Sequence, residues 1–537
     1  RQGTLLLLVS LAGWCCCLLV ASARLRGLLI NSTLLAGGAL LISAPIGSLL
    51  AIAIAKTSLW GRRWLEGLLI VWLFVPLYVQ ATAWQATVGQ GGWLVDQSWL
   101  TGWGGAIWIH GIAAIPWVVL FVAATLRKVP RELEEESLQD VAAWKVLVSV
   151  SLRQASAGIV AASLWVAVIC FSEITVTDLF QVRTFAEEIY TAASLGTLDG
   201  GAIESAVRPI DQAEVPQFVS SQLWLGTLAI VFLVVAALAA IWIWVPVANF
   251  ISPTVHWIWE PRRGRWLVSI APWLLAIVVV GLPLLGLLGK AGAVIVPSNG
   301  IAVQTWSPTK AAQLIAASPW EHRREFGWSL TIGAVAAVSA TAIAVVIAWS
   351  LRTSRLPTLP TALALAWGFA VPGPLLGVWI IRWLNHPTDS ILAPLTWCYD
   401  HTILAPVLAQ LLRALPLATL IVGTQFTSIP QGVLDSAKSE GAGWWQRLFQ
   451  VALPWCWPAV AAASCMALIV ALGDLAATLL VAPPGVSPLS VRIFGLLHYG
   501  AEDRVSALCL MLIVLLAVVV TLAWRAPALL DRSSNHD

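Results

Sequence analysis

The residues best suited to a specific interaction lie in one polar segment that begins at Ser428. Ser428 can cap a helix, with Gln431 as its capping-box partner, and Pro430 suits the first helical turn. Gly441 permits a sharp reversal that a side chain would resist, and Pro454 is tolerated near the start of the following helix. This spacing predicts a short helix, a glycine break and a second helix. Such a pair is a docking element for another protein.

Two acidic residues, Glu173 and Asp474, lie in strongly apolar stretches, and a threonine follows each four residues later, Thr177 or Thr478. A charged carboxylate in an apolar environment is costly unless it faces water or a partner. We predict that these four residues line a pathway for a cationic or metal-bearing substrate. The alternative is that each carboxylate bonds to neighbouring backbone and acts as a structural hinge.

Residues that could carry catalysis or hold a cofactor are present but not arranged for it. No G-x-S-x-G segment occurs, and the eight cysteines include no C-x-x-C pair. A hydrolase site, a disulfide framework and a zinc site therefore have no support. The segment from Gly281 to Lys290 lacks the G-x-x-x-x-G-K-[ST] spacing that cradles phosphates. We expect no enzymatic activity, no metal site and no cofactor bound by this chain.

The elements that carry these residues belong to a membrane protein. Of 537 residues, 59% are hydrophobic and 11% are charged, and the mean hydropathy is +0.85. Soluble domains are about one-quarter charged. Apolar runs long enough for helical spans recur along the chain, and the net charge of +3 is too small to indicate nucleic-acid binding. The predicted fold class is all-α, a polytopic membrane protein.

We predict twelve spans, at residues 4–23, 30–55, 66–86, 105–126, 155–180, 221–248, 267–288, 328–350, 359–384, 401–424, 456–482 and 505–524. Loops on the side of the amino terminus carry 18 Lys and Arg residues, and the opposite loops carry 10. The positive-inside rule therefore places both termini in the cytoplasm. The first stretch precedes Ala21-Ser22-Ala23 and could be a cleaved signal peptide. We expect a retained helix, because it is long enough to span and gives an even number of spans.

Comparison of the chain with itself indicates a duplication at an offset near 300 residues. The matches are Val75-Pro76 with Val371-Pro372, Val129-Pro130-Arg131 with Ile429-Pro430-Gln431, and residues 172–177 with 473–478. Each copy holds six spans, so the copies share one orientation and a pathway between them is expected. We divide the chain into a first half at 1–250, a connecting span and extracytoplasmic loop at 251–320, and a second half at 321–537.

The polar segment resembles the cytoplasmic loop of ABC importer permeases, which carries E-A-A, three residues, G, nine residues and I-x-L-P. Here Asp435-Ser436-Ala437 precedes three residues, Gly441, nine residues and Val451–Pro454. Asp replaces Glu and Ser replaces Ala, while the spacing is kept. The first half holds a degenerate copy of this motif, which is one residue shorter. It has Glu135-Glu136-Ser137, with Val141 in place of the glycine and Arg153 in place of the proline. We expect its docking helix to differ in shape.

The resemblance implies that two such loops fit clefts on an ATPase dimer, which hydrolyses ATP and drives alternating access of the membrane helices. It also implies an extracytoplasmic substrate-binding protein. The outer loops at 181–220 and 289–327 are long and polar, and we expect them to contribute to its docking surface. The residues to which the resemblance assigns ATPase coupling are Glu135, Glu136, Ser137, Asp435, Ser436, Ala437, Gly441, Leu453 and Pro454.

Twelve spans in two fused halves resemble the ferric-iron permeases among these importers of the inner (plasma) membrane. The segments 172–180 and 473–480 look like those that follow the docking loops of iron(III) permeases. Ferric iron is therefore the expected cargo, while thiamine and phosphonate importers have related architectures and stay open. An ion-coupled secondary transporter is the alternative from another class, although it needs no glycine-broken docking helices.

Overall fold

The computed structural model of the protein describes residues 2–89, 92, 100–194, 220–244, 265–298, 301–387, 390–499 and 502–531. The chain divides into two compact units. The first unit comprises residues 1–316, 370–375 and 499–510, and the second comprises 317–369, 376–498 and 511–537. The division of the chain into two permease halves and a connecting segment stays a prediction.

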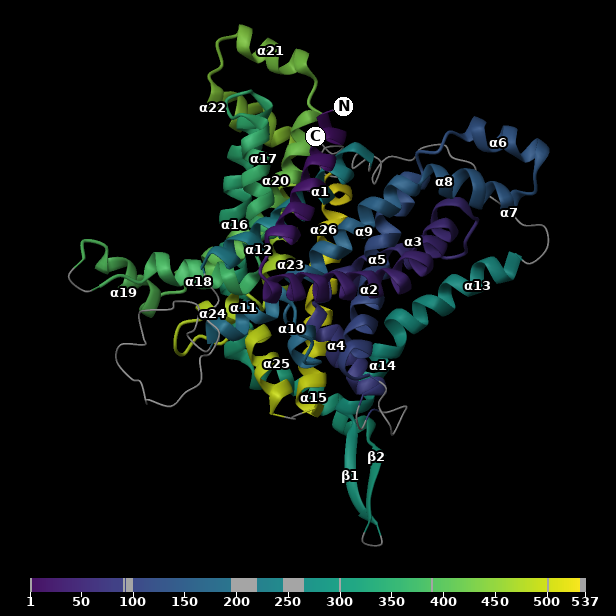
Figure 1. Ribbon diagram of the computed structural model, residues 1–537, viewed down its shortest axis with the longest axis vertical. Coiled ribbons are helices and arrows are strands. Elements are labelled where there is room, and N and C mark those ends of the chain that lie inside the picture. Colours follow the sequence, from purple (N-terminus) through teal and green to yellow (C-terminus); the bar gives the residue numbers. More distant parts are fainter. Residues whose placement is uncertain are drawn as a thin grey trace. The chain divides into compact units, whose positions relative to one another are not determined.

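Helices make up almost all of the described structure, so the expected all-α class is confirmed (Figure 1). The elements up to the hairpin are α1 (Gln2–Val20), α2 (Ala23–Lys56), α3 (Arg62–Leu73), α4 (Leu77–Val88), α5 (Gly102–Leu126), α6 (Arg131–Asp140), α7 (Ala143–Val146), the π-helix η1 (Leu147–Ser151), α8 (Leu152–Gln154), α9 (Ser156–Ser172), α10 (Thr175–Leu179), α11 (Phe185–Ser194), α12 (Ser220–Trp244), α13 (Arg265–Ala276), η3 (Ile277–Gly281), α14 (Leu282–Ala291), β1 (Ala293–Ser298) and β2 (Ile301–Trp306). The remaining elements are α15 (Pro308–Glu321), α16 (Arg323–Arg352), α17 (Thr358–Ala370), α18 (Gly373–Leu384), α19 (Ala393–His401), α20 (Leu404–Thr427), α21 (Gln431–Ser439), α22 (Trp444–Gln446), the π-helix η4 (Arg447–Ala452), α23 (Leu453–Gly473), α24 (Thr478–Val481), α25 (Leu489–His498) and α26 (Glu502–Asp531).

Within the described residues, seven helices are long and apolar enough to cross a membrane, and three further pairs reach that length across a bend. Two shorter apolar helices lie at Leu7–Val20 and Trp224–Ala240. Each of the twelve predicted stretches overlaps one of these helices or pairs, and two of the stretches, 4–23 and 221–248, overlap only the shorter apolar helices. The chain is therefore a multi-pass membrane protein.

Two predicted spans are sharply broken rather than kinked. The α3–α4 pair bends by 105° before Pro76, and the pair of Pro360–Gly368 and Gly373–Leu384 bends by 101° at Pro372. Proline lacks an N–H and disfavours helical backbone in the residue before it. Each proline therefore ends one helix and lets the next begin in a new direction.

Two other predicted spans are too long. The stretch predicted at 155–180 ends its helix at Ser172, and the stretch predicted at 456–482 ends its helix at Gly473. Glu173 and Asp474 follow in extended conformation, and the short helices α10 and α24 come next. The helices end there because both carboxylates bond to backbone beyond the break.

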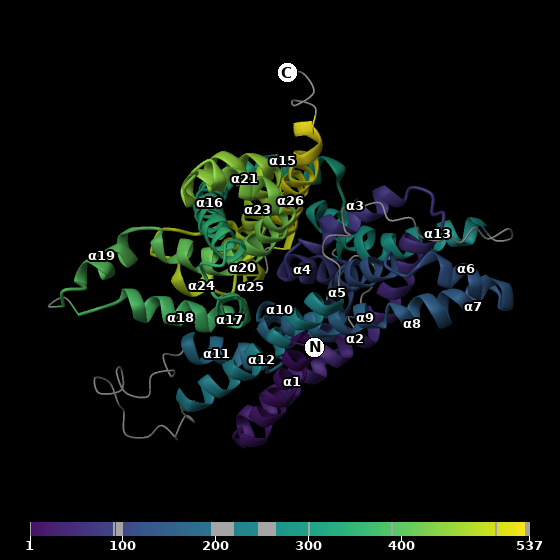
Figure 2. The same cartoon turned by 90° about the horizontal axis from the view of Figure 1, so that it is seen from above.

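The first unit is built around α2, which packs along α5 and α9, while α1 pairs with α12 (Figure 2). Glycines let α2 and α5 approach closely. A Cβ on Gly47 would lie 2.6 Å from Cβ of Val118, and one on Gly111 would lie 2.9 Å from Cβ of Ile42. Membrane helices commonly associate through such small residues, because they bring the backbones into van der Waals contact.

The second unit contains a bundle of α16, α20 and α23 (Figure 2). Its centre is lined by alanines, among them Ala337, Ala340, Ala414 and Ala467. The three helices are therefore closely packed, and they form the platform that carries α21 and α22.

One two-stranded antiparallel sheet, β1–β2, lies among the described residues, in the outer loop predicted at 289–327. Its register pairs Ala293 with Trp306 and Ser298 with Ile301. The hairpin and α6 lie at opposite ends of the first unit (Figure 1). This arrangement agrees with the predicted placement of these two loops on opposite sides of the membrane.

Helices recur in the same order along the chain. The bent pair, α5, α6, η1, α9, α10 and α11 are followed later by a second bent pair, α20, α21, η4, α23, α24 and α25. The interval is 300 residues for the first residues of α6 and α21, Arg131 and Gln431. A proline interrupts α5 at Pro116 and α20 at Pro416, again 300 residues apart.

Candidate functional site

The predicted docking helix of the second loop, α21, begins directly after Pro430, which has φ −58° and ψ 133° and so precedes the helical backbone. Leu434 is buried, while Asp435 and Ser436 are exposed. Asp435 accepts a hydrogen bond from Gln431, one turn earlier, at 3.1 Å. The helix therefore offers its polar face outward and holds one apolar side chain inward.

The expected capping of α21 by Ser428 is wrong. The Ser428 hydroxyl donates to the carbonyl of Gln425 at 2.7 Å, so it belongs to the end of α20. Gln431 is the first residue of α21, and its side-chain oxygen accepts from Arg352 at 2.9 Å. Pro430 occupies the N-cap position with no side-chain bond, and it contributes no unsatisfied N–H of its own.

Gly441 makes the predicted reversal. Its φ is +87°, and its N–H donates to the carbonyl of Lys438 at 3.0 Å, while Ala442 N–H donates to Ala437 at 3.0 Å. This left-handed backbone favours glycine. Pro454 lies at the start of α23, as expected. The glycine-broken helix pair is therefore present in the second loop.

Substitution Gly441→Val, the residue found at the matching place of the first loop, is expected to strain this turn by about 1–2 kcal/mol. Amide hydrogen exchange at residues 441 and 442 should speed up about tenfold or more. The matched control is Gly432→Ala, because a Cβ there meets nothing within 4 Å and lies inside α21. It should stabilise the helix slightly. Equal rates of amide exchange at residues 441 and 442 in the two variants would refute a backbone role for Gly441.

Leu434 holds α21 on the bundle through apolar contacts. It belongs to a buried cluster with Trp349 and Phe426, whose rings meet edge to face at 5.7 Å, and with Leu448 and Ala452. Burial of one leucine side chain stabilises by about 1.5–3 kcal/mol. The second docking helix is thus seated by hydrophobic packing.

A second connection ties the segment after Gly441 to the end of α16. The Trp444 indole N–H donates to the Thr353 hydroxyl at 2.9 Å, and the Trp349 indole N–H donates to the Trp444 carbonyl at 3.3 Å. The Arg355 guanidinium lies 4.8 Å from the centre of the Trp444 ring. These contacts fix the direction in which the loop returns to the membrane.

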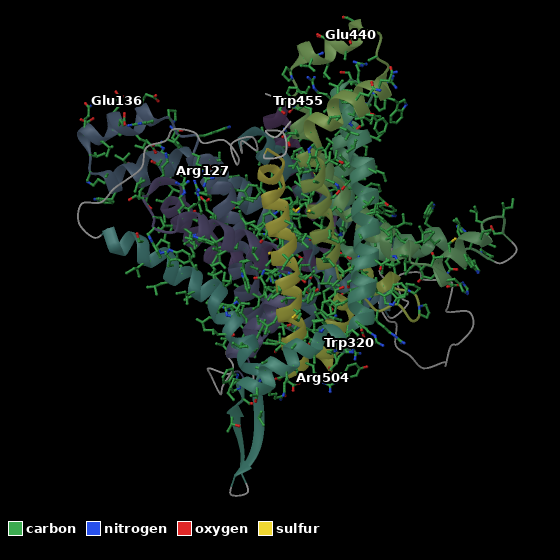
Figure 3. The ribbon with its side chains drawn as sticks, turned by 180° about the vertical axis from the view of Figure 1, so that it is seen from behind. Arg127, Glu136, Trp320, Glu440, Trp455 and Arg504 are labelled. Atoms are coloured by element: carbon green, nitrogen blue, oxygen red, sulfur yellow. The ribbon has the colours of Figure 1, made fainter. Side chains whose placement is uncertain are left out.

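The first docking helix, α6, has the same inward and outward positions. Glu135 and Glu136 are exposed, as Asp435 and Ser436 are, and the buried position of Leu434 is taken by Glu134. Figure 3 shows Glu136 at the opposite end of the first unit from Arg504, and Glu440, just after α21, at the opposite end of the second unit from Trp320.

The two docking helices end differently, as expected from the lost glycine. Val141 follows α6 in extended conformation, with φ −135°, and its N–H donates to the carbonyl of Ser137 at 3.1 Å. The chain then turns into α7 and the π-helix η1, as it turns into α22 and η4 in the second loop. A docking helix followed by a π-helical turn is common to both loops.

Glu173 anchors the junction between α9 and α10. Its carboxylate accepts from the N–H groups of Thr175, at 2.6 Å, and Val176, at 3.0 Å, and from the Thr175 hydroxyl. Thr177 was predicted to line the same pathway, and its hydroxyl donates to the backbone carbonyl of Ile174 at 3.0 Å. The described bonds match the structural-hinge alternative, while a pathway role stays a prediction.

Asp474 makes the matching junction in the second unit. It accepts from the N–H of Thr478 at 3.1 Å and from its hydroxyl at 2.7 Å, so this threonine is the expected partner. Gln410 on α20 reaches the Thr478 hydroxyl at 3.4 Å. A polar network therefore links α20 to the end of α23.

His110 was not among the predicted site residues, yet it meets Glu173. Its Nδ1 lies 2.8 Å from the carbonyl of Ala106, so Nδ1 carries the proton. Its Nε2 lies 3.5 Å from the Glu173 carboxylate, and 300 residues later Gln410 occupies the matching place. The spacing relates His110 to Gln410, but it gave no indication that His110 contacts Glu173.

The outer loops are described in part. Glu188 pairs with Arg24, and Glu187 accepts from Thr191 at 2.8 Å; burial raises the pKa of the Glu187 carboxyl. Lys310 pairs with Asp503 at 3.0 Å, and Lys290 with Glu502. The acidic residues Asp199, Glu204, Asp211 and Glu214 of the first outer loop lie outside the described residues. A role of these loops in binding a partner stays a prediction.

These features define a class of protein, the all-helical, polytopic membrane protein. Residues 329–534 match the family described as "Binding-protein-dependent transport system inner membrane component". That region contains α21, Gly441 and Asp474. This part of the chain is therefore similar to the inner-membrane permeases of binding-protein-dependent transport systems.

Two relatives have names that state a transport system. The chain is 33% identical over 111 residues to the "Putative 2-aminoethylphosphonate transport system permease protein PhnV" of Salmonella typhimurium, covering 21% of this chain and 41% of the relative. It is 22% identical over 141 residues to the "Putrescine transport system permease protein PotI" of Escherichia coli K12, covering 26% and 50%. The chain thus spans half or less of the length of each relative.

Proposed function

We propose that this chain is the transmembrane permease of an ATP-driven importer in the inner membrane, with two fused permease halves and both termini in the cytoplasm. The observation that carries the proposal is the pair of exposed docking helices, α6 and α21, with the same buried and exposed positions 300 residues apart. The family match over residues 329–534 supports it for the second loop.

In this proposal a separate ATPase dimer binds α6 and α21 and hydrolyses ATP, and this chain is not an enzyme. The exposed carboxylates of α6 and the exposed polar face of α21 contact the ATPase. Closure of the ATPase dimer moves both docking helices, and the bundle of α16, α20 and α23 carries that movement to the broken span at Pro372. An extracytoplasmic binding protein delivers the substrate at the opposite face.

Ferric iron is the cargo that we propose first, because the segments after both docking loops look like those of iron(III) permeases and each holds a carboxylate, Glu173 or Asp474. The similarity to PhnV favours a second candidate, an aminoalkylphosphonate. The two cargoes differ in charge and in ligand chemistry, so one assay separates them.

The test is ATP hydrolysis by the complex purified with its ATPase and binding protein, in the presence of Fe(III), 2-aminoethylphosphonate, thiamine or putrescine. We expect stimulation that requires the binding protein and a single cargo. A matched sample without the binding protein is the control. Uptake driven by a proton or sodium gradient, without an associated ATPase, would contradict the proposal and favour a secondary transporter.

A further inference from the structure

The inner side of α6 is held by charge rather than by packing. Glu134 is the one residue of this helix that is buried, and its carboxylate lies 2.7 and 2.8 Å from the ammonium of Lys56. Neither side chain is exposed to any degree, at 0% each. A third partner, the Ser151 hydroxyl, donates to the same carboxylate at 2.6 Å.

These three residues join three elements far apart in sequence. Lys56 is the last residue of α2, Glu134 lies in the middle of α6, and Ser151 is the last residue of η1. Two charges removed from water are tolerated only when paired and hydrogen-bonded, as these are. The carboxylate therefore fixes α6 against α2 and against the turn by which the chain re-enters the membrane.

In the second docking loop the buried position is apolar, and the charged side chain of Arg352 binds Gln431 at the exposed start of α21. Leu434 lies 300 residues after Glu134. Ala452 is the last residue of η4, as Ser151 is the last residue of η1. Leu434 and Ala452 are both buried in the cluster that contains Trp349. The second loop also has the turn at Gly441, while the first has Val141.

We infer that Lys56, Glu134 and Ser151 are the positioning residues of the first docking helix. Their buried ion pair takes the place of the apolar packing around Leu434 and the turn at Gly441 in the second loop. The first loop, which departs from the motif, thus contains a docking helix that is held by an ion pair. We call this ion pair, with Ser151, the anchor of α6. This inference rests on the proposed function for what α6 docks, but the anchor itself is tested without an ATPase.

The test is hydrogen exchange of the full chain in lipid nanodiscs, read at residues 131–140 and, as an internal control, at 431–439. Glu134→Leu leaves the Lys56 ammonium buried without an oppositely charged partner. Lys56→Met leaves the Glu134 carboxylate in the same position. Each should speed exchange in α6 at least a hundredfold and leave α21 unchanged. The double variant Lys56→Met/Glu134→Leu, which copies the chemistry of the second loop, should return exchange to within about tenfold of the original chain.

Unchanged exchange at residues 131–140 in both single variants would overturn the inference. If the single variants fail to accumulate in the membrane, the double variant decides, because recovery by removal of both charges requires that they act as a pair. A double variant that behaves no better than the worse single variant would also overturn it.

A second measurement separates this inference from the proposed function. In the ATPase complex, the single variants should lose at least tenfold of cargo-stimulated hydrolysis, and the double variant should recover most of it. If exchange responds as expected but no ATPase binds the original chain, the anchor stands and the proposed function fails. If the ATPase binds and exchange does not respond, the anchor fails alone.

Discussion

Replacing Leu434 with glutamate is expected to release α21 from its bundle and to abolish coupling between cargo and ATP hydrolysis. The side chain enters an apolar cluster formed by Trp349, Phe426, Leu448 and Ala452. Burying an isolated carboxylate costs several kcal/mol, more than the apolar contacts of one leucine supply. Hydrogen exchange at residues 431–439 should rise at least a hundredfold, and cargo-stimulated ATPase activity should fall to the basal rate.

The matched control is Leu356→Glu, which makes the same chemical change in the same unit at a side chain that is 38% exposed. It should leave exchange in α21 and ATPase stimulation close to those of the original chain. Protection of α21 that survives Leu434→Glu would show that the contacts of Arg352 and Trp444, rather than apolar packing, hold the loop.

The second large effect is expected at the carboxylates that end α9 and α23. Glu173→Ala removes the acceptor for two backbone N–H groups and one hydroxyl, and buried donors left unpaired cost about 1–3 kcal/mol each. The midpoint of thermal unfolding should fall by several degrees, and uptake should be lost. Thr175→Ser, which keeps the hydroxyl, is the conservative control and should change neither.

Charge is separated from geometry by Glu173→Gln and Asp474→Asn, which retain the size of the side chains. If the carboxylates line the path of a cationic cargo, the double variant should keep its unfolding midpoint within a few degrees and lose at least tenfold of uptake. Uptake at the original rate would leave both residues with the structural role that their bonds to Thr175 and Thr478 already describe.

Local chemistry explains why much of the docking element could be predicted. Gly441 was expected to reverse the chain and does so at φ +87°, because a left-handed residue is required there and the sequence places a glycine. Pro76 and Pro372 interrupt their helices for the same kind of local reason, since the missing N–H acts within one turn. The capping of α21 was mispredicted because Ser428 had a nearer acceptor, the carbonyl of Gln425.

Contacts between distant residues were beyond such reasoning. Glu134 looks like one more charge in an acidic loop, and only the fold brings it to Lys56, 78 residues away. The meeting of His110 with Glu173 and of Gln410 with Thr478 likewise depends on how helices pack. Periodicity and spacing carry no information on which faces of two helices meet.

By itself, the sequence determined that the chain is a helical membrane protein, because apolar runs of span length have no other stable form in lipid. It also determined where docking helices begin and turn, because prolines and glycines act on their own backbone. Only the tertiary structure decided what holds each docking helix in place, an ion pair with Lys56 for α6 and apolar packing around Leu434 for α21. Burial decides this difference, since a carboxylate is solvated in a loop and needs a cation once the fold removes it from water.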